Sequence, residues 1–390
     1  MEDRLRILSR RCERILTEQD LLRKMQLSRP LRIKMGMDPT APDVTLGHAV
    51  PLKVIRQFQE WGHKAVLIIG DVTGRVGDPS GVNVTRPMLT AEQVQTNATT
   101  YIQQVGRILL SDPQHLEIRY NSEWLAKMDV FELIRLAGRK TVAQMLQRDS
   151  FKERFEKGSD IHLHEFIYPL LQGWDSVAIE ADVEMGGSDQ LFNNLVGREF
   201  QAEMGKDPQV VMVTPLLVGT DGVMKMSKSK GNYVAVTDEP NNMFGKIMSI
   251  PDSLLENYYT LLTDLPAEEF KPLIASDPRN AKVRLAQTIV AWLHGEPAGH
   301  GAVEHFNRTI VNKEIPAEMP EIQVGAGPHQ LAPLLVKAGL AASNSEAIRK
   351  IREGAVRIDG QKVMDFQKQY SFDAPAVLQL GNRKFARLIP

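Results

Sequence analysis

Residues 31–69 have the sequence LRIKMGMDPTAPDVTLGHAVPLKVIRQFQEWGHKAVLII, and this stretch determines the fold that we expect. Its first five residues predict a short strand. The continuous apolar run Ala65–Ile69 predicts a second strand that is buried on both faces, as in a parallel sheet. Between them, Ala49–Trp61 carries apolar residues at helical spacing. A strand, a helix and a strand in this order form a βαβ unit, which binds ligands at the carboxyl ends of its strands.

The regions that follow extend this α/β pattern. Val183–Met185 and Val210–Leu217 predict two more strands. Thr90 with Gln93 resembles a capping box at the start of another helix. From Glu239 to about Asn312 the pattern is mainly helical, which indicates a separate region.

The C-terminal end has a different character. Ala317–Pro328 is rich in Pro and Gly and is the best candidate for a linker. Beyond it, Asp359-Gly360 between two short β-prone segments predicts a hairpin. We therefore expect an α/β fold with a Rossmann-like parallel-sheet domain, a helical domain and a small α+β domain. The predicted ranges are 1–238, 239–316 and 329–390, with the linker at 317–328.

The composition is that of a globular protein, with 43% hydrophobic and 24% charged residues. The single cysteine, Cys12, excludes an internal disulfide framework and a cysteine-based metal site. No apolar run approaches the roughly 20 residues of a membrane-spanning helix. The first residues also lack the apolar segment of a secretory signal. We therefore expect a cytoplasmic protein with no membrane partner and no metal site of its own.

Charge is distributed unevenly along the chain, although the net charge is only −1. Residues 327–390 contain ten Lys and Arg against five Asp and Glu, a net charge of +5, so the remainder carries −6. A basic module attached to a mildly acidic body suggests contact with a polyanion. A solvated basic surface explains the same charge equally well.

Two segments contain residues suited to binding phosphate. Gly36–His48 places the hydroxyls of Thr40 and Thr45 just before a helix N-terminus, where backbone N–H groups and the helix dipole favour an anion. Lys225 and Lys228 lie among small residues on a loop, which suits the transient binding of a pyrophosphate leaving group. Composition alone favours a solvated basic loop for this second segment.

Two further segments suggest a polar pocket beside the βαβ unit. Tyr168, Gln172 and Asp175 have the spacing i, i+4 and i+7, which puts all three on one helical face. Asp189, within Gly186–Gln190, follows a strand in the way of acidic residues that bind ribose hydroxyls. A solvent-facing stripe and a plain helix N-cap are the simpler interpretations.

Together these segments resemble the class I tyrosyl-tRNA synthetases, and the resemblance covers nearly the whole chain. Each motif alone is weak evidence, but their joint order and spacing are very specific. The matching motifs are Asp38-Pro39-Thr40 with Gly47-His48, Gly77–Gly81, Tyr168-x3-Gln172-x2-Asp175, Gly186–Gln190, and the letters KMSKS at Lys225–Ser229. The end from about Gln330 resembles an S-four-type RNA-binding module.

The resemblance implies a two-step reaction. Tyrosine attacks the α-phosphate of ATP, which carries Mg²⁺ as its counter-ion, and gives tyrosyl-adenylate and pyrophosphate. The tyrosyl group then passes to the 3′ end of tRNA(Tyr). The resemblance also implies that the helical domain binds the anticodon side of the tRNA and that the protein is a homodimer.

Roles for individual residues follow from the same resemblance, with Asp175 expected to accept the substrate phenol. L-tyrosine is expected to contact Lys34, Asp78, Tyr168, Gln172, Asp175 and Gln190. ATP is expected to contact Asp38, Gly47, His48, Gly187, Asp189 and Lys228. Catalysis is expected to depend on Thr40, Thr45, His48, Lys225, Lys228 and Ser229. The tRNA is expected to contact Arg349, Lys350, Arg352, Arg357 and Lys362.

Two positions depart from the pattern of the family. The first class I signature usually begins with histidine, whereas this chain has Thr45, whose shorter hydroxyl should bind phosphate less strongly. The loss of one such donor costs on the order of 10² to 10³ in rate unless another group compensates. Many family members have tyrosine where this chain has Lys34, although some relatives carry lysine, which suggests a subgroup.

Three other functions fit part of the sequence. Asp175 and the basic C-terminal module argue against a tryptophanyl synthetase. Thr45 alone favours an RNA-binding paralogue that has lost amino-acid activation, and the intact KMSKS motif argues against it. An enzyme that activates a tyrosine analogue also fits. Tyrosine-dependent exchange of pyrophosphate into ATP distinguishes these functions.

Overall fold

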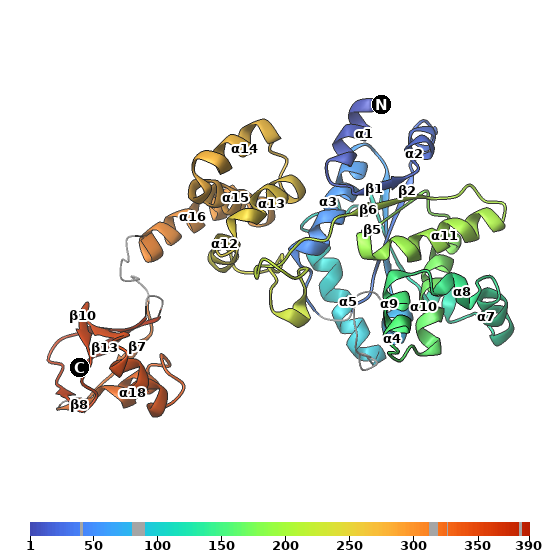
Figure 1. Cartoon of the computed structure of the whole chain (residues 1–390). Coiled ribbons are helices and arrows are strands. Elements are labelled where there is room, and N and C mark those ends of the chain that lie inside the picture. The colour runs from blue at the N-terminus through green and yellow to red at the C-terminus, as the bar shows by residue number, and fades with distance from the viewer. Residues whose placement is uncertain (40–41, 80–89, 312–318, 326, 382–383) are drawn as a thin grey trace. The chain divides into compact units, whose positions relative to one another are not determined.

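The structure is a computed structural model that describes all residues except 40–41, 80–89, 312–318, 326 and 382–383. It divides into two compact units, Met1–Gly299 and His300–Pro390 (Figure 1). Thr40, Ser80 and Gly81, which belong to the predicted motifs, lie outside the described residues. Within the described part of the chain, no helix has the length and apolar character needed to cross a lipid bilayer.

A six-stranded sheet forms the centre of the first unit (Figure 1). In spatial order its strands are β1 (Arg14–Leu16), β6 (Val210–Thr214), β5 (Val183–Gly187), β2 (Arg32–Met37), β3 (Lys64–Ile69) and β4 (Leu116–Tyr120). β1 runs antiparallel to β6, and the other neighbouring strands are parallel. The predicted βαβ unit is confirmed as β2, α3 (Leu46–Glu60) and β3. The sequence analysis did not predict β1 or β4.

Helices pack against this sheet, and all residues of β6 and nearly all of β3 are buried. Helix α3 contacts β3, β5 and β6, while α11 (Leu191–Glu203) contacts β5 and β6. The other helices of this region are α1 (Glu2–Ser9), α2 (Glu18–Lys24), α4 (Thr73–Val76), α5 (Ala91–Val105), α6 (Ser122–Leu125), α7 (Val130–Ala137), α8 (Val142–Met145), α9 (Asp149–Glu156) and α10 (Leu163–Ala178). The predicted capping box of Thr90 and Gln93 is present at the start of α5.

Helices α10 and α11 pack very closely, and two glycines permit this contact. A Cβ atom on Gly173 of α10 would lie 2.8 Å from a side-chain carbon of Val196. A Cβ atom on Gly197 of α11 would lie 2.7 Å from the hydroxyl of Ser176. Such distances are shorter than any tolerated contact, so larger residues would push the helices apart. The close packing fixes the position of the α10 face that carries the predicted pocket residues.

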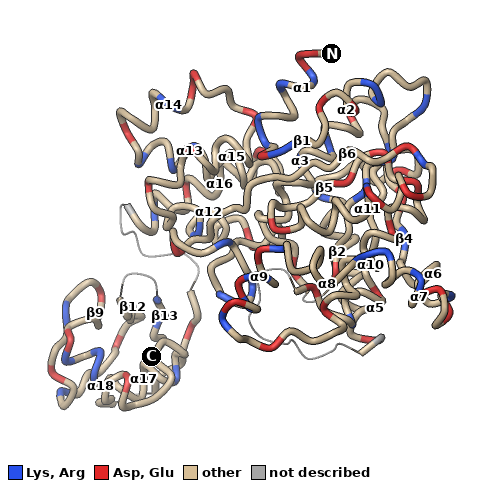
Figure 2. Tube along the Cα trace, turned by 45° about the vertical axis from the view of Figure 1, so that its right-hand side comes forward, with Lys and Arg blue, Asp and Glu red and all other residues tan. Residues whose placement is uncertain are grey.

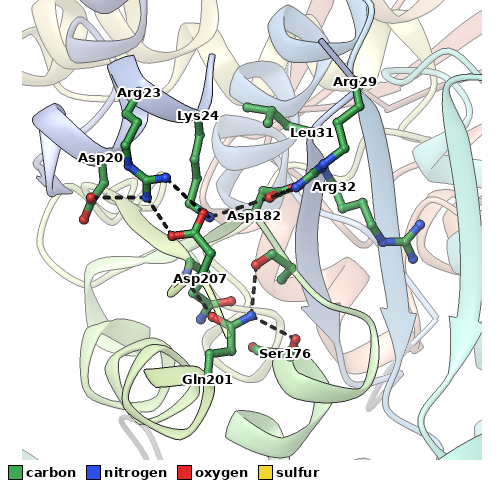
Figure 3. A network of polar contacts seen from close by, with 12 residues as sticks. Asp20, Arg23, Lys24, Arg29, Leu31, Arg32, Ser176, Asp182, Gln201 and Asp207 are labelled. Atoms are coloured by element: carbon green, nitrogen blue, oxygen red, sulfur yellow. Dashed lines mark hydrogen bonds and ion pairs between the residues drawn. The ribbon is translucent and has the colours of Figure 1, made fainter. Parts of the chain in front are cut away.

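An ion-pair network holds the amino ends of β2, β5 and β6 (Figure 3). Arg29 donates to both carboxylate oxygens of Asp182 at 2.6 and 2.7 Å. Lys24 and Arg23, at the end of α2, donate to Asp207 at 2.7 and 2.6 Å. These contacts tie α2 to the amino edge of the sheet. The predicted site residues lie at the opposite, carboxyl edge.

The helical region predicted from Glu239 onward is present. It consists of α12 (Pro240–Met248), α13 (Leu255–Leu262), α14 (Ala267–Ser276), α15 (Pro278–His294) and α16 (Glu296–Phe306), followed by the π-helical turn Asn307–Val311. Tyr259 stacks on Phe270 with ring centroids 4.9 Å apart, and both rings are buried. Tyr258 donates its hydroxyl to the carbonyl of Val218 at 2.6 Å, which ties α13 to the segment after β6.

After the end of the helical region, the second unit contains a five-stranded sheet, a two-stranded sheet and two helices around one apolar core. The elements are β7 (Glu321–Gln323), β8 (His329–Gln330), α17 (Leu331–Lys337), α18 (Asn344–Arg352), β9 (Val356–Ile358), β10 (Gln361–Val363), β11 (Gln369–Tyr370), β12 (Ala376–Leu380) and β13 (Lys384–Ile389). The predicted hairpin is confirmed, and Asp359 and Gly360 have the positive φ angles of 47° and 80° that its turn requires. β7 pairs with β13 although it lies inside the predicted linker. The sheet therefore begins before the domain boundary that the sequence suggested.

Candidate functional site

The predicted site residues of the first unit gather where β2, β3 and β5 end. β2 lies between β3 and β5: the chain runs from β2 to β3 and β4 and then crosses back to β5 on the other side of β2, so the strand order reverses there. A crevice at such a switch point is the usual ligand site of an open parallel sheet. Asp38 follows β2 directly, and Gly187 is the last residue of β5. The site is therefore built from segments that are far apart in the sequence.

Asp38 is fixed at the end of β2 by two hydroxyl groups. Tyr168 of α10 donates to its Oδ2 at 2.8 Å, and Thr73 of α4 donates to its Oδ1 at 2.7 Å. Gly70 makes this possible, because a Cβ atom there would lie 1.9 Å from Oδ1. Burial and the nearby Asp38 carboxylate raise the pKa of Tyr168 well above its usual value. Tyr168 therefore keeps its proton and acts as a hydrogen-bond donor.

Asp175 is the most deeply buried of the three predicted pocket residues on α10, with only 3% of its surface exposed. Trp124 donates its indole N–H to Oδ1 at 2.7 Å, and Asn121 donates to Oδ2 at 3.4 Å. Burial raises the pKa of Asp175 to about 7, while Lys34 and the two donors oppose this rise. The carboxyl group therefore changes its charge near neutral pH, which is unusual for an aspartate.

Gln172 and Gln190 are joined through Asn193 of α11. The amide of Asn193 donates to Gln172 Oε1 at 2.8 Å and to Gln190 Oε1 at 3.1 Å. Gln190 in turn donates to Asp78 Oδ2 at 2.7 Å. Three of the residues predicted to bind one ligand are thus brought together, although they come from α10, from the turn before α11 and from the segment after α4.

Lys34 of β2 is completely buried, and its ammonium group faces protein acceptors. It donates to the carbonyl of Gln172 at 3.0 Å, to the hydroxyl of Ser176 at 2.7 Å and to Glu184 at 2.7 Å. Its three N–H groups are therefore all used within the protein. The structure places Lys34 behind α10, although the sequence resemblance suggested contact with the substrate.

Thr45 contacts His48 at the N-terminus of α3. The Thr45 side chain is buried, and its hydroxyl lies 2.8 Å from His48 Nδ1. The backbone N–H of Thr45 also points at Nδ1, at 3.3 Å, so this nitrogen is the acceptor. Burial, with the charges of Lys228 and Lys225, lowers the pKa of His48 to about 4. His48 is therefore neutral at physiological pH and carries its proton on Nε2.

The KMSKS segment lies against this N-terminus and against the end of β5. A Cβ atom on Gly47 would lie 3.7 Å from the Cβ of Met226. Lys225 forms an ion pair with Asp189 Oδ2 at 2.8 Å. Lys228 donates to the hydroxyl of Tyr101 at 2.6 Å. Both signature lysines are thus held beside the residues that are predicted to bind a nucleotide.

The predicted RNA-binding residues lie in the second unit. Arg349, Lys350 and Arg352 occupy the last turn of α18, whereas Arg357 and Lys362 lie on β9 and β10. Figure 2 shows the Lys and Arg positions along the chain in blue. All of these side chains are exposed except that of Lys350, which is half-buried. Lys350 pairs with Glu353 at 2.7 Å, and the guanidinium of Arg352 lies 4.5 Å from the ring centroid of Phe366. Positive charge and an aromatic ring therefore share one small surface.

Sequence reasoning missed several residues that shape the site. Asn121 and Trp124 hold Asp175, Tyr101 holds Lys228, and Glu184 pairs with Lys34. Asn121 follows β4 directly, so an earlier recognition of that strand would have identified it as a residue at the carboxyl edge. Among the described residues, no group of three or more His, Cys, Asp or Glu side chains is placed to hold a metal ion.

Comparison with known proteins identifies the family. Residues 25–310 match the family model of class I tRNA synthetases (W and Y), and residues 312–379 match the C-terminal domain of SYY-like tyrosine–tRNA ligases. The chain is 49% identical to the tyrosine–tRNA ligase of Bordetella bronchiseptica, over 100% of this chain and 96% of that one. It is 52% identical to the corresponding enzyme of Mannheimia succiniciproducens, over 98% and 97% of the two chains.

Solved structures agree with the fold. A C-terminally truncated mitochondrial tyrosyl-tRNA synthetase from Aspergillus nidulans gives a TM-score of 0.64 at 24% identity, over 78% of this chain and 92% of that one. The tyrosyl-tRNA synthetase of Archaeoglobus fulgidus gives 0.62 at 22% identity, over 77% and 99%. These identities are low, so the structures support the Rossmann-like α/β fold alone. The full-length relatives decide the identity: this chain belongs to the tyrosine–tRNA ligases, a family of class I aminoacyl-tRNA synthetases.

Proposed function

We propose that the carboxyl edge of the sheet binds tyrosine and ATP together and joins them as tyrosyl-adenylate. The observation that carries this proposal is the ion pair between Lys225 and Asp189. It brings the KMSKS segment to the strand end beside which Gln190 and Gln172 converge on Asn193. The residues expected for the amino acid and those expected for the nucleotide therefore border one crevice.

In this proposal the tyrosine side chain points toward Asp175. The carboxylate of Asp175 accepts a hydrogen bond from the phenol hydroxyl, while Trp124 and Asn121 hold this carboxylate in place. Tyr168, Gln172, Asp78 and Gln190 contact the α-ammonium end of the substrate. Phenylalanine would leave the buried carboxylate without its partner, which is the physical basis of selection for tyrosine.

For ATP, we assign the ribose to Asp189 and Gly187, and the adenylate to Asp38, Gly47 and His48. The proton on His48 Nε2 can be donated to an oxygen of the nucleotide. Lys225 and Lys228 stabilise by their charge, and Thr40 and Ser229 by their hydroxyls, the negative charge that grows on pyrophosphate as it leaves. Mg²⁺ arrives with ATP as its counter-ion. No covalent enzyme intermediate is required, so positioning and electrostatic stabilisation supply the catalysis.

The second step transfers the tyrosyl group to tRNA(Tyr), with the protein acting in the cytoplasm. We assign tRNA contact to the basic surface of α18, β9 and β10 and to the helical region from residue 239 to 316. We propose that this helical region and the C-terminal module are separate domains, and the domain limits given above stay predictions. The C-terminal one should begin at or before β7, because β7 pairs with β13.

The experiment that tests the proposed activation is exchange of labelled pyrophosphate into ATP with each amino acid in turn. Tyrosine should support exchange far better than phenylalanine or tryptophan. If no amino acid supports exchange, the chain is not an activating enzyme. If an analogue of tyrosine is preferred, activation holds but the assignment of the substrate is wrong.

Removal of residues 319–390 tests the role of the second unit. We expect exchange to continue, because the residues of the activation site all lie in the first unit. Aminoacylation should fall on the order of tenfold or more, because several phosphate contacts are lost together. Exchange and aminoacylation are measured on the same preparation. Equal loss of both activities would mean that the second unit supports the structure of the active site.

Exposed apolar side chains support the proposed homodimer. Phe131 and Leu163 are 71% and 82% exposed, which is rare for large apolar side chains of a monomer. Val130, Ile134, Val142 and Phe155 are exposed in the same part of the chain, between the starts of α7 and α10. Most homo-oligomers are twofold dimers that bury such a surface against its own copy.

The corresponding prediction is that Phe131→Asp produces a monomer. An aspartate in place of this exposed apolar side chain would have to be buried unpaired in a dimer that covers it. Light scattering after size exclusion should change from about twice the chain mass of 43.7 kDa to about that mass. Met364→Asp is the matched control, since Met364 is exposed but lies in the second unit. A wild-type protein that is already monomeric would contradict the proposal.

Thr45 provides a prediction about the first signature. Thr45→Val keeps the shape of the side chain but removes the hydroxyl that lies 2.8 Å from His48 Nδ1. We expect the rate of exchange to fall about three- to tenfold, the effect of losing one neutral hydrogen bond. Thr45→Ser should restore most of the rate. Equal rates for all three proteins would show that the hydroxyl does not orient His48.

A further inference from the structure

Lys34 and Glu184 form an ion pair that is sealed inside the first unit. Lys34 lies on β2 and Glu184 on the neighbouring strand β5, and their exposed fractions are 0% and 1%. Lys34 Nζ is 2.7 Å from Glu184 Oε1. Burial of two charges is costly unless both are well hydrogen-bonded, so such a pair is seldom kept without a purpose.

Lys34 uses all of its N–H donors within the protein, and two of them bind α10. Two of its hydrogen bonds go to Gln172 and Ser176, which lie three residues before and one residue after Asp175. The third goes to Glu184. The ammonium group is thus attached to the helical turn that carries Asp175. It has no N–H left for a substrate hydroxyl.

Glu184 has its own set of donors besides Lys34. Ser176 donates to Oε2 at 2.9 Å, Gln209 donates to the same oxygen, and Gln172 donates to Oε1 at 3.4 Å. The negative charge is therefore stabilised by neutral groups as well. A glutamine at this position can keep several of these contacts after the charge is removed.

The two charges of the pair act on Asp175 in opposite directions. Burial raises the pKa of Asp175 to about 7, Lys34 is the strongest influence that lowers it, and Glu184 raises it more weakly. Trp124 and Asn121 of the α6 segment also favour the ionised form. On the remaining side, Tyr168 of α10 is a neutral donor to Asp38. The positive charge among these groups is that of Lys34.

We propose that Lys34 is a positioning residue for tyrosine recognition: as a fixed buried charge paired with Glu184, it keeps Asp175 in the carboxylate form that accepts the substrate phenol. This inference rests on the proposed assignment of Asp175 to the phenol. It replaces the expectation that Lys34 itself contacts tyrosine. An uncharged carboxyl group would be a weaker acceptor for the phenol hydroxyl.

The test is the pH dependence of the KM for tyrosine in pyrophosphate exchange, at saturating ATP and from about one pH unit below to one above the pKa of Asp175. In the wild type, KM should rise as pH falls through about 7, because Asp175 becomes protonated. Asp175→Asn should lack this rise. If the wild type shows exchange without such a rise, or if Asp175→Asn keeps it, the assignment of Asp175 is overturned.

Two variants then separate the role of Lys34 from that of Asp175. Lys34→Met/Glu184→Gln removes both charges together, so that no unpaired charge is buried and the protein should fold. The rise of KM with falling pH, which is the acid limb of the profile, should lie at higher pH in this double variant than in the wild type. Glu184→Gln leaves the positive charge unopposed, and its limb should lie at lower pH. Together the two variants should differ by about one pH unit or more, the effect of an adjacent charge.

The outcomes are distinct. Opposite displacement of the two limbs supports the proposal. Limbs that coincide with that of the wild type overturn it, even if KM or the melting temperature changes, because a purely structural role predicts that result. A uniform rise of KM at every pH in the double variant, without displacement of the limb, overturns it in the same way.

Discussion

Replacement of Asp175 by alanine is expected to reduce the preference for tyrosine over phenylalanine by about 10⁴ to 10⁵. The wild-type preference arises because phenylalanine would leave a buried carboxylate unpaired, together with the donors of Trp124 and Asn121. Once the carboxylate is gone, the phenol hydroxyl of tyrosine has lost its acceptor, and binding of phenylalanine no longer leaves a buried charge unpaired. Discrimination is measured as the ratio of kcat/KM for the two amino acids in pyrophosphate exchange.

Asp175→Asn is the matched variant, because it keeps the size of the side chain. It removes a charge whose burial opposes folding at neutral pH, so we expect this variant to be at least as stable as the wild type. A retained preference for tyrosine in both variants would contradict the assignment of the phenol to Asp175. A loss of activity with both amino acids, combined with a lower melting temperature, would point to disruption of the pocket instead.

The position of Asp175 illustrates what the sequence could predict. Tyr168, Gln172 and Asp175 share one face because helical spacing alone determines it, and the structure confirms that all three are buried. The βαβ unit was predictable for the same reason, since apolar spacing is a local property. Local patterns therefore determine which residues face the crevice.

Contacts between distant segments could not be derived in this way. Trp124 and Asn121 lie 51 and 54 residues from Asp175, and Lys34 lies 150 residues from Glu184. No sequence spacing indicates that these side chains meet, because their meeting depends on how β2, β4 and β5 are ordered in the sheet. β4 was also missed for a physical reason: LEIRY mixes charged and apolar residues, as expected of a strand at the edge of the sheet.

The structure changes the interpretation of Lys34 and Thr45, the two departures from the family pattern, because their partners in the folded chain could not be derived from the sequence. From the sequence, Thr45 was a weaker phosphate donor and Lys34 a candidate substrate contact. In the folded chain Thr45 faces His48, and Lys34 faces Glu184. Thr45 thus contacts His48, which was assigned to ATP, and Lys34 also donates to the carbonyl of Gln172, which was assigned to tyrosine. Partners inside the protein thus decide what a substituted residue can do.

The KMSKS lysines should have the largest effect on the rate of the chemical step. We expect Lys225→Ala and Lys228→Ala each to lower kcat for exchange by about 10² to 10³, the effect of losing one group that stabilises transition-state charge. The KM for tyrosine should change little, because the residues proposed to bind tyrosine lie on α10 and around Asn193. Lys230→Ala is the control, since Lys230 is exposed in the same segment.

The two lysines should differ in their effect on ATP. Lys225 is paired with Asp189, the residue assigned to the ribose, so binding of ATP must displace it from that carboxylate. Lys225→Ala removes this competition, and its KM for ATP should fall as its kcat falls. Lys228 contacts Tyr101 instead, so Lys228→Ala should lower kcat without lowering this KM. If the KM for ATP responded in the same way to both changes, the ion pair with Asp189 would not compete with the ribose, and Lys225 would act on pyrophosphate alone.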